Sequence, residues 1–376
     1  MSISTSSIEK DLKPIITGDV LCDDTSRNSY STAACIYRIR PVAVVVPRTM
    51  EDVQTVVRYA FENQIPLIPR GGATSLAGQA VGFGIVLDCA RYLNKILEVD
   101  VQNNWVKVEP GVVLERLNKH LSPSGKFFPP DPASASDCVI GGMIGTNATG
   151  AHGLRYGATK DYVLSLTTVL SSGELVEFAA NSEDQKPREI SSPAGNGNAR
   201  YNTLRKLLVE NKSLILSGYP KVKKNSSGYN LFDAVGSDRI DLTKILTGSE
   251  GTLGLIVGAK LRILDLPKAR AEGLAYFRDH DSMAEAVLES LPLKPAAIEL
   301  MDKTLLDLAR GRNANVERFI EEEAQVLLLF EFEAETPDQA AGQLDELRKI
   351  LTEKLRLAFT FRVNPENLGS LWEVRK

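Results

Sequence analysis

The sequence predicts an α+β fold that is divided into two domains. A chain of 376 residues has room for two domains of ordinary size, and its 43% hydrophobic content is that of a folded protein. The first part reads as a β-rich unit with one crossover helix, and the part after Pro267 has the order β-α-(α)-β-α-β. That second order is typical of a ferredoxin-like domain.

The first domain begins with a strand and a capped helix. AVVV (43–46) ends at Pro47, and Thr49-x-x-Asp52 offers a capping box to a helix with Val53 and Val57 on its apolar face. A short helix over 113–121 is striped by leucines and ends before a Pro and a Gly. Strands are expected over 66–69, 85–88, 96–100 and 105–111.

The stretch from 127 to 157 contains too many Gly, Pro and small residues for a regular element. Such a long irregular stretch inside a compact domain is usually functional. The rest of the first domain is expected to contain a hairpin over 163–178, a polar surface insertion over 179–200, a helix around 202–216, a loop over 219–231 and strands flanking 248–264.

The second domain is expected to begin with the strand GLAYF (273–277). The predicted elements that follow are a helix over 281–291, a helix near 300–310, the strand VLLLFEFE (326–333), a helix over 337–354 and the strand FTFRV (359–363).

Composition excludes several classes of function. The 44 Lys and Arg residues against 48 Asp and Glu leave a net charge of −4, so there is no basic surplus for binding nucleic acid. The four cysteines form no C-x-x-C pair, and the three histidines have no metal-ligand spacing. We therefore expect no metal site, free thiols, a cytoplasmic location and no transmembrane segment.

Three glycine segments could hold a phosphate-bearing ligand: 69–79, 140–153 and 248–254. A backbone without Cβ can approach a ligand closely and turn its N–H groups toward an anion. Each segment taken singly is more simply a tight turn in a β-rich protein. Three of them in one domain, one with Arg70 at its mouth, favour a large phosphate-bearing cofactor. Neither the Rossmann glycine motif nor the P-loop motif occurs.

A known family shares these segments. PRGGATSLAGQ, VEPGV, PPDP, IGGMIGTNATG, RYG, KNSSGY and GSEGTLG, in this order, resemble the FAD-binding domain of the vanillyl-alcohol oxidase/p-cresol methylhydroxylase (PCMH) superfamily. The branch that the chain resembles most contains glycolate oxidase FAD subunits, D-lactate dehydrogenases and D-2-hydroxyglutarate dehydrogenases. The resemblance implies an N-terminal extension (1–36), a PCMH-type two-subdomain FAD-binding domain (37–267) and an incomplete ferredoxin-like cap domain for the substrate (268–376).

The resemblance also implies which residues bind FAD. The loop after the strand at 66–69 would wrap the pyrophosphate, the segment 130–137 would lie along the flavin, and the two later glycine segments would cross the dinucleotide and line its far wall. The implied residues are Arg70, Gly71, Gly72, Ala73, Thr74, Ser75, Leu76, Gly78, Gln79, Pro130, Asp131, Asp137, Gly141, Gly142, Thr146, Asn147, Gly150, Glu250, Gly251 and Ile256.

Two histidine positions bear on the chemistry. Members with covalent flavin carry a His in or beside the first glycine loop, and here that stretch is Gly72-Ala73-Thr74, so the FAD should be non-covalent. His152 is the one histidine near a proposed flavin loop, which makes it a candidate catalytic residue. A histidine after a glycine turn also commonly caps or packs.

Arg375 resembles the arginine of the family's Leu-Trp-x-x-Arg helix, which grips the substrate carboxylate. A guanidinium suits this role because its fork matches a carboxylate and stays charged. The family's later histidine-rich stretch, the source of a metal ligand pair or of the catalytic base, does not occur here. We therefore expect this chain to be the N-terminal part of a longer FAD protein, and a [4Fe–4S] module, carried by several relatives, would lie outside it.

Several functions remain open. The first is an FAD-dependent dehydrogenase that passes a hydride from a small-molecule 2-hydroxy acid to FAD. The electrons would then go to an Fe–S module, a quinone or a cytochrome, so that the protein could sit peripherally at a membrane. The second is a non-catalytic flavin-binding or electron-relay subunit that needs a partner chain or its missing C-terminus. A third, an enoyl reductase sharing the fold, would oxidise NADPH.

Overall fold

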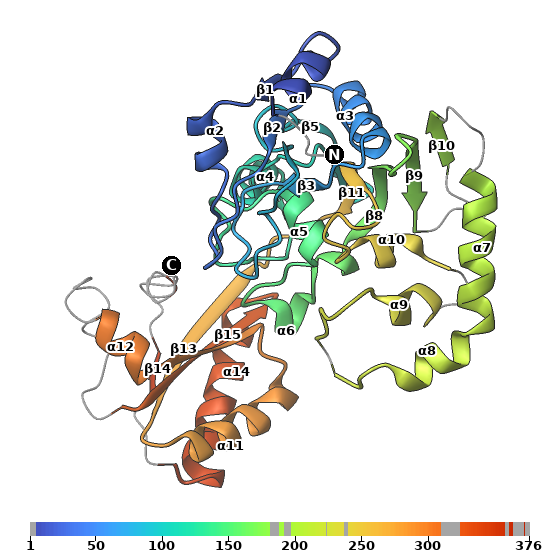
Figure 1. Ribbon diagram of the computed structural model, residues 1–376. Coiled ribbons are helices and arrows are strands. Elements are labelled where there is room, and N and C mark those ends of the chain that lie inside the picture. The colour runs from blue at the N-terminus through green and yellow to red at the C-terminus, as the bar shows by residue number, and fades with distance from the viewer. Residues whose placement is uncertain are drawn as a thin grey trace. The chain divides into compact units, whose positions relative to one another are not determined.

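The computed structural model describes residues 5–180, 188–191, 197–222, 224–236, 240–309, 324–357, 361–363 and 372. Two compact units form (Figure 1). Unit 1 contains residues 1–128, 134–148 and 158–264, and unit 2 contains residues 129–133, 149–157 and 265–376. The last border lies near the predicted one at Pro267, but two short segments from the first half of the chain join unit 2. The predicted domain boundaries stay predictions.

The first sheet of unit 1 has four strands in the order β1-β2-β4-β3. Its strands β2, β4 and β3 are parallel, and β1 pairs antiparallel with β2. The predicted strands at 43–46, 66–69 and 85–88 are therefore correct. The strands are β1 (Asp19–Leu21), β2 (Ala43–Val46), β3 (Leu67–Arg70) and β4 (Ile85–Asp88).

Helix α3 (Met50–Glu62) connects β2 to β3 and packs between the two sheets of unit 1. Val53 and Val56 contact the core that Val45 and Leu87 form with Val257 of the second sheet. Thr49 caps the helix as predicted, because its hydroxyl accepts a hydrogen bond from the Asp52 N–H at 3.1 Å. The preceding helices are α1 (Thr5–Leu12) and α2 (Asp24–Ser29).

The second sheet of unit 1 has six antiparallel strands in the order β10-β9-β8-β11-β6-β5. The predicted hairpin is present as β8 and β9. Strand β10 extends the sheet inside the stretch that the sequence predicts as a surface insertion. The strands are β5 (Ile96–Asp100), β6 (Trp105–Val108), β8 (Val163–Val169), β9 (Leu175–Ala179), β10 (Arg188–Ser191) and β11 (Leu255–Arg262).

Unit 1 contains several helices besides α3. The predicted helix at 113–121 is α4 (Leu114–Leu121), whereas the one around 202–216 is divided at Asn211 into two. The prediction of no regular element over 127–157 is wrong at α5 (Ile140–Thr146) and α6 (Gly153–Tyr156), because glycines with helical dihedral angles fit helices despite their low propensity. The remaining elements are β7 (Lys126–Phe127), α7 (Gly197–Glu210), α8 (Lys212–Gly218), α9 (Leu231–Gly236), α10 (Leu242–Leu246) and β12 (Leu264–Asp265).

Unit 2 contains an antiparallel sheet in the order β14-β15-β13-β16. Because helix α11 (His280–Ser290) follows the first of these strands in the chain and helix α14 (Pro337–Lys349) follows the third, this is the ferredoxin-like order that the sequence predicts. The helix predicted near 300–310 begins too early, because residues 297–302 pair with β15 as a strand. The elements are β13 (Ala269–Phe277), α11 (His280–Ser290), β14 (Ala297–Asp302), α12 (Lys303–Ala309), β15 (Val326–Ala334), α14 (Pro337–Lys349) and β16 (Phe361–Val363).

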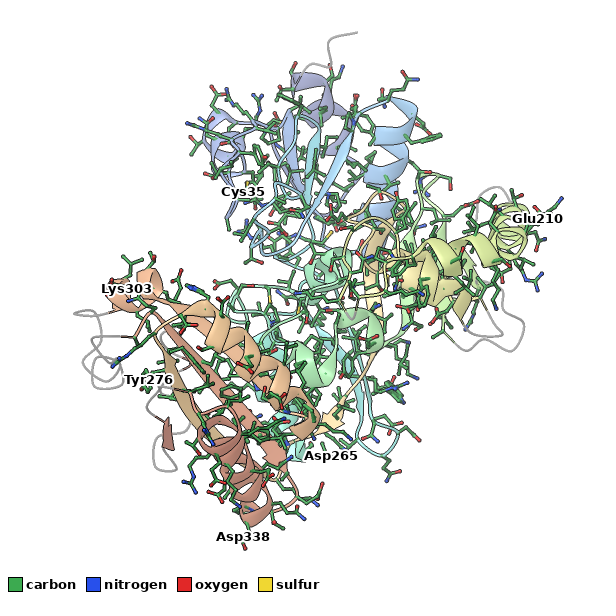
Figure 2. All side chains as sticks on the ribbon, turned by 90° about the horizontal axis from the view of Figure 1, so that it is seen from below. Cys35, Glu210, Asp265, Tyr276, Lys303 and Asp338 are labelled. Carbon is green, nitrogen blue, oxygen red and sulfur yellow. The ribbon has the colours of Figure 1, made fainter. Side chains whose placement is uncertain are left out.

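The two faces of β15 differ in what they bury. Val326, Leu328, Phe330 and Phe332 pack with α11 and α14 on one face. Figure 2 draws the side chains of this unit, with Tyr276 marking β13 and Asp338 the beginning of α14. The opposite face buries Leu327 and Leu329, and then continues with two acidic residues that are discussed below. None of the described helices has the length and apolar character that crossing a bilayer requires.

Asp52 connects the start of α3 to the N-terminal segment. Its carboxylate is buried and accepts hydrogen bonds from the Thr17 N–H at 2.8 Å, the Thr17 hydroxyl at 2.9 Å and the Arg48 N–H at 2.9 Å. Burial by itself raises the pKa of Asp52, but the hydrogen bonds from Thr17 and Arg48 outweigh it and hold the pKa below its usual value.

We therefore expect Asp52→Asn to lower the free energy of unfolding at pH 7 by about 2 kcal/mol, since buried donors lose their acceptor. Because the native pKa is depressed, this advantage of the wild type is present above about pH 4 and disappears as the pH falls through the native pKa. Urea unfolding at pH 7 and at pH 3 measures both effects. The exposed neighbour Glu51→Gln is the control, and an equal loss in both variants would contradict the role of Asp52.

Candidate functional site

The loop that follows β3 presents a row of backbone donors. Among the described residues, no N–H from Gly72 to Gly78 donates a hydrogen bond to a protein acceptor. Ala73 and Gly78 have left-handed backbones, with φ of 56° and 96°. A left-handed residue beside residues of negative φ is the backbone geometry of an anion-binding nest, in which successive N–H groups turn toward one side. The local geometry thus suits a phosphate group, as the glycine pattern predicts.

The three predicted glycine segments come together in unit 1. A Cβ on Gly72 would stand 2.1 Å from the carbonyl oxygen of Asp137, so the first loop lies directly against the segment that leads into α5. The third segment joins them through Glu250, whose N–H donates to the Gly145 carbonyl at 2.9 Å and whose carboxylate accepts from the Gln79 amide at 3.1 Å. Gln79 and Glu250, which are 171 positions apart in the sequence, are therefore in direct contact.

Helix α5 carries glycines that protein packing does not explain. A Cβ on Gly142 would meet nothing closer than a Val139 methyl at 3.8 Å, and one on Gly145 would meet no protein atom within 4 Å. Glycine inside a helix costs about 0.5–1 kcal/mol relative to alanine, so open space beside it points to another reason. Close approach of a ligand to the helix is such a reason. By contrast, Gly141 packs against Pro110.

One side-chain atom at this place is left without a partner. The Gln79 Oε1 atom is buried and accepts no hydrogen bond, although its Nε2 atom is bonded to Glu250. Buried acceptors are nearly always satisfied in folded proteins. An additional donor, such as a ligand hydroxyl or amide, would complete Gln79. The open nest, the uncovered glycines and this acceptor together fit a dinucleotide.

Other predicted residues of unit 1 lie in the same segments with less direct evidence. The Arg70 guanidinium donates to the carbonyls of Tyr30 and Ala80, both at 3.2 Å, so its side chain holds the fold together. The Asn147 side chain accepts from the Lys160 N–H at 3.0 Å, and the Thr146 hydroxyl donates to the Gly142 carbonyl at 3.0 Å. The remaining ones are Gly71, Thr74, Ser75, Leu76, Asp137, Gly251 and Ile256, and a role for any of them in binding stays a prediction.

Among the described residues, four predicted site residues belong to unit 2 and not to unit 1: Pro130, Asp131, Gly150 and His152. Asp131 holds His152 at two points, since one carboxylate oxygen accepts the His152 N–H at 3.2 Å and the other lies 2.5 Å from Nδ1. Gly150 makes this possible, because a Cβ there would stand 2.0 Å from the Asp131 carbonyl. Their predicted places along the flavin stay predictions.

His152 faces two acidic residues that sequence reasoning did not single out. Its Nε2 lies 2.9 Å from Glu331, and Glu333 follows on the same face of β15. Arg270 lies 3.5 Å from Glu331 and 3.1 Å from Glu333, and Arg155 lies 3.1 Å from Glu333. The Tyr156 hydroxyl also donates to Glu333. Only the alternation of acidic and apolar residues in FEFE could have marked this cluster in the sequence.

The cluster changes the acidity of His152. Burial by itself lowers the pKa of the imidazole, but hydrogen bonds to Asp131 and Glu331 and the charges of both carboxylates raise it to about 10. Trp372 stacks on the imidazole, with ring centroids 5.3 Å apart. The predicted carboxylate clamp, Arg375, lies outside the described residues.

Two parts of the chain match known protein families. Residues 41–179 match the family described as "FAD binding domain", and residues 266–376 match "FAD linked oxidases, C-terminal domain". The chain therefore contains both an FAD-binding domain and the C-terminal domain of the FAD-linked oxidases. The resemblance read from the glycine segments is thus confirmed, and so is FAD as the cofactor of the family.

Three curated relatives place this chain more closely. It is 35% identical to D-2-hydroxyglutarate dehydrogenase of Escherichia coli (strain K12) over 78% of its own length and 29% of that relative. It is 29% identical to glycolate oxidase subunit GlcD of Bacillus subtilis (strain 168), over 72% of the chain and 47% of the relative. It is 27% identical to D-lactate dehydrogenase of Anaerostipes hadrus, over 96% of the chain and 66% of the relative. The chain spans less than a third of the length of the first of these.

A solved structure shares the fold. A p-cresol methylhydroxylase with bound substrate superimposes with a TM-score of 0.69 at 14% sequence identity, covering 98% of this chain and 68% of the other. The predicted PCMH-type α+β fold of this chain is therefore correct.

The glycines of α5 give a matched test. Gly142→Ala and Gly342→Ala both add a methyl group where no protein atom lies within 3.7 Å, the second on α14 of unit 2. Without ligand, each substitution is expected to raise the free energy of unfolding by about 0.5–1 kcal/mol. Only Gly142→Ala should weaken FAD binding, by about tenfold or more, because the methyl group fills space that the ligand needs.

Thermal unfolding of the apoprotein and titration of FAD by flavin fluorescence measure the two effects. Equal FAD affinity in the two variants would remove the argument for a ligand beside α5.

Proposed function

We propose that this chain binds FAD non-covalently and uses it to oxidise a small 2-hydroxy acid. The observation that carries the proposal is the row of unpaired N–H groups from Gly72 to Gly78, held beside the uncovered glycines of α5 in unit 1. The names of the relatives support 2-hydroxy acids of the D-2-hydroxyglutarate, glycolate and D-lactate type as substrates. The chain's length relative to these proteins makes the activity a proposal.

The chain's residues would share the work of binding. The nest after β3 would hold the pyrophosphate, since backbone donors suit an anion and require no side-chain charge. The uncovered face of α5 would let the dinucleotide pass close to the backbone, and Gln79 would gain its missing donor. The stretch Gly72-Ala73-Thr74 has no histidine where members with covalent flavin carry one in or beside this loop, so nothing here is suited to attach the flavin. When bound, FAD supplies the acceptor for a hydride.

The substrate side of the site would depend on Arg375. Its guanidinium would bind the carboxylate that every 2-hydroxy acid carries, with two parallel hydrogen bonds. Electrons would then leave to an Fe–S module, a quinone or a cytochrome. Those acceptors, the cytoplasmic location and the domain boundaries at 36/37 and 267/268 are parts of the same proposal.

Flavin binding is tested first. The purified chain should be yellow or become yellow on reconstitution with FAD, and acid precipitation should release the flavin into the supernatant, because no covalent bond holds it. A colourless chain that takes up no FAD contradicts both the proposed oxidation and a non-catalytic flavin-binding role. Flavin that stays in the pellet contradicts only the non-covalent attachment.

Reduction of the bound flavin tests the chemistry. Under anaerobic conditions, one of D-2-hydroxyglutarate, D-lactate or glycolate should bleach the flavin absorption of the FAD-loaded chain. If none does, whereas a longer form of the protein is bleached, this chain is a flavin-binding part that needs further residues. Oxidation of NADPH instead would favour an enoyl reductase.

Arg375→Ala should weaken substrate binding by about 10- to 100-fold in the same experiment, since a hydrogen bond to a charged group contributes about 1.5–3 kcal/mol. The neighbouring Lys376→Ala is the control, because it removes the same charge without the guanidinium fork. The concentration of hydroxy acid that gives half-maximal flavin reduction measures the effect. If substrate binding were weakened equally in both variants, the cause would be the loss of positive charge and not the guanidinium of Arg375.

A further inference from the structure

The cluster around His152 contains groups that the proposed flavin site does not use. His152, Glu331 and Glu333 each offer one ligand atom, and these atoms lie within 4.8 Å of one another. All three residues belong to unit 2. His152 comes from the short segment 149–157, and the two glutamates come from alternate positions of β15. One imidazole nitrogen and two carboxylates at this spacing are a set of ligands for a divalent metal ion.

Each of the two carboxylates has one oxygen that accepts no hydrogen bond within the described chain. Glu331 Oε2 and Glu333 Oε1 are buried and accept no hydrogen bond. The two side chains are 1% and 0% exposed, so water does not reach them either. An ionised carboxylate that loses its water must regain a donor or a cation. The Glu331 atom has no ion-pair partner among the described residues, whereas Arg270 lies 3.1 Å from the Glu333 atom.

Acidic side chains gather at this face of the sheet. Glu272 lies directly opposite Glu331 in the pairing of β13 with β15 and is also buried. Asp131 adds a fourth carboxylate, so that four acidic side chains gather among the described residues. Buried carboxylates that gather in this way pair with cations or bind a metal ion.

The orientation of His152 suits a metal ligand. Asp131 takes both the backbone N–H and the Nδ1 side of the ring, which leaves Nε2 to face Glu331 at 2.9 Å. A carboxylate on the far nitrogen of a histidine is the usual second partner of metal-binding histidines, because it selects the tautomer and holds the ring.

We propose that His152, Glu331 and Glu333 bind a divalent transition-metal ion, with Asp131 holding His152 in position. Nitrogen and oxygen ligands without thiolate suit Zn²⁺, and Mn²⁺ binds the same set more weakly. The ion links the segment 149–157 to β15. The proposal does not depend on flavin binding, and it departs from the expectation of no metal site.

Calorimetric titration of the chelator-treated full chain with Zn²⁺ tests the proposal. One equivalent should bind and raise the melting temperature, because a ligand that binds only the native state stabilises it. His152→Ala and Glu331→Gln should abolish this site, and Asp131→Asn should weaken it by about 10- to 100-fold. The exposed histidines provide matched controls, so His120→Ala and His280→Ala should leave the affinity unchanged. Mn²⁺ should bind at the same place with lower affinity.

Two further measurements separate the site from other causes. Co²⁺ in place of Zn²⁺ should give weak visible bands without a thiolate charge-transfer band, which excludes binding by the cysteines. Circular dichroism and urea unfolding report whether each variant folds. If Glu331→Gln does not fold, Asp131→Asn still tests the site, since the Asp131 side chain is 34% exposed. The proposal is overturned if the wild type binds no metal, or if His152→Ala binds it with unchanged stoichiometry and affinity. The cluster would then be an ion-pair network without a metal ion.

Discussion

The contact between two backbones, at Gly72 and at Asp137, is the constraint on which the arrangement of unit 1 depends. At a separation of 2.1 Å between the position of a Cβ and a carbonyl oxygen, no residue other than glycine fits. The contact sets the loop after β3 beside the start of α5, and the Gly145 carbonyl and Gln79 then bring Glu250 to the same place. This contact therefore brings the loop with unpaired N–H groups beside the helix with uncovered glycines.

Sequence reasoning located most elements, because they follow local rules. The strand at 43–46 and the Thr49 cap of α3 are visible in a few consecutive residues, and the order of elements after Pro267 predicted the ferredoxin-like sheet. Two predictions of secondary structure were wrong. Glycine-rich residues 140–146 form α5 because tertiary contacts overrode low propensity, and residues 297–302 form a strand because β15 pairs with them.

The candidate site was predictable to a different extent in the two units. In unit 1 the glycine segments could be found because a close approach of two backbones requires glycine, and glycines are visible in the sequence. In unit 2 the partners of His152 could not be found, because Glu331 lies 179 positions away and an acidic residue in a strand is ordinarily exposed. Arg375 rests on resemblance, and its surroundings lie outside the described residues.

The course of the chain between the units limits how the protein could be divided or recombined. The polypeptide leaves unit 1 after Phe128, returns at Ser134, leaves again after Ala148 and returns at Ala158 before its last passage near Asp265. A cut at the last passage would remove Glu331 and Glu333 but leave Asp131 and His152 behind. The C-terminal unit is therefore not a cassette that can be exchanged between relatives, and a chimera would have to carry the residues 129–133 and 149–157 from the same parent.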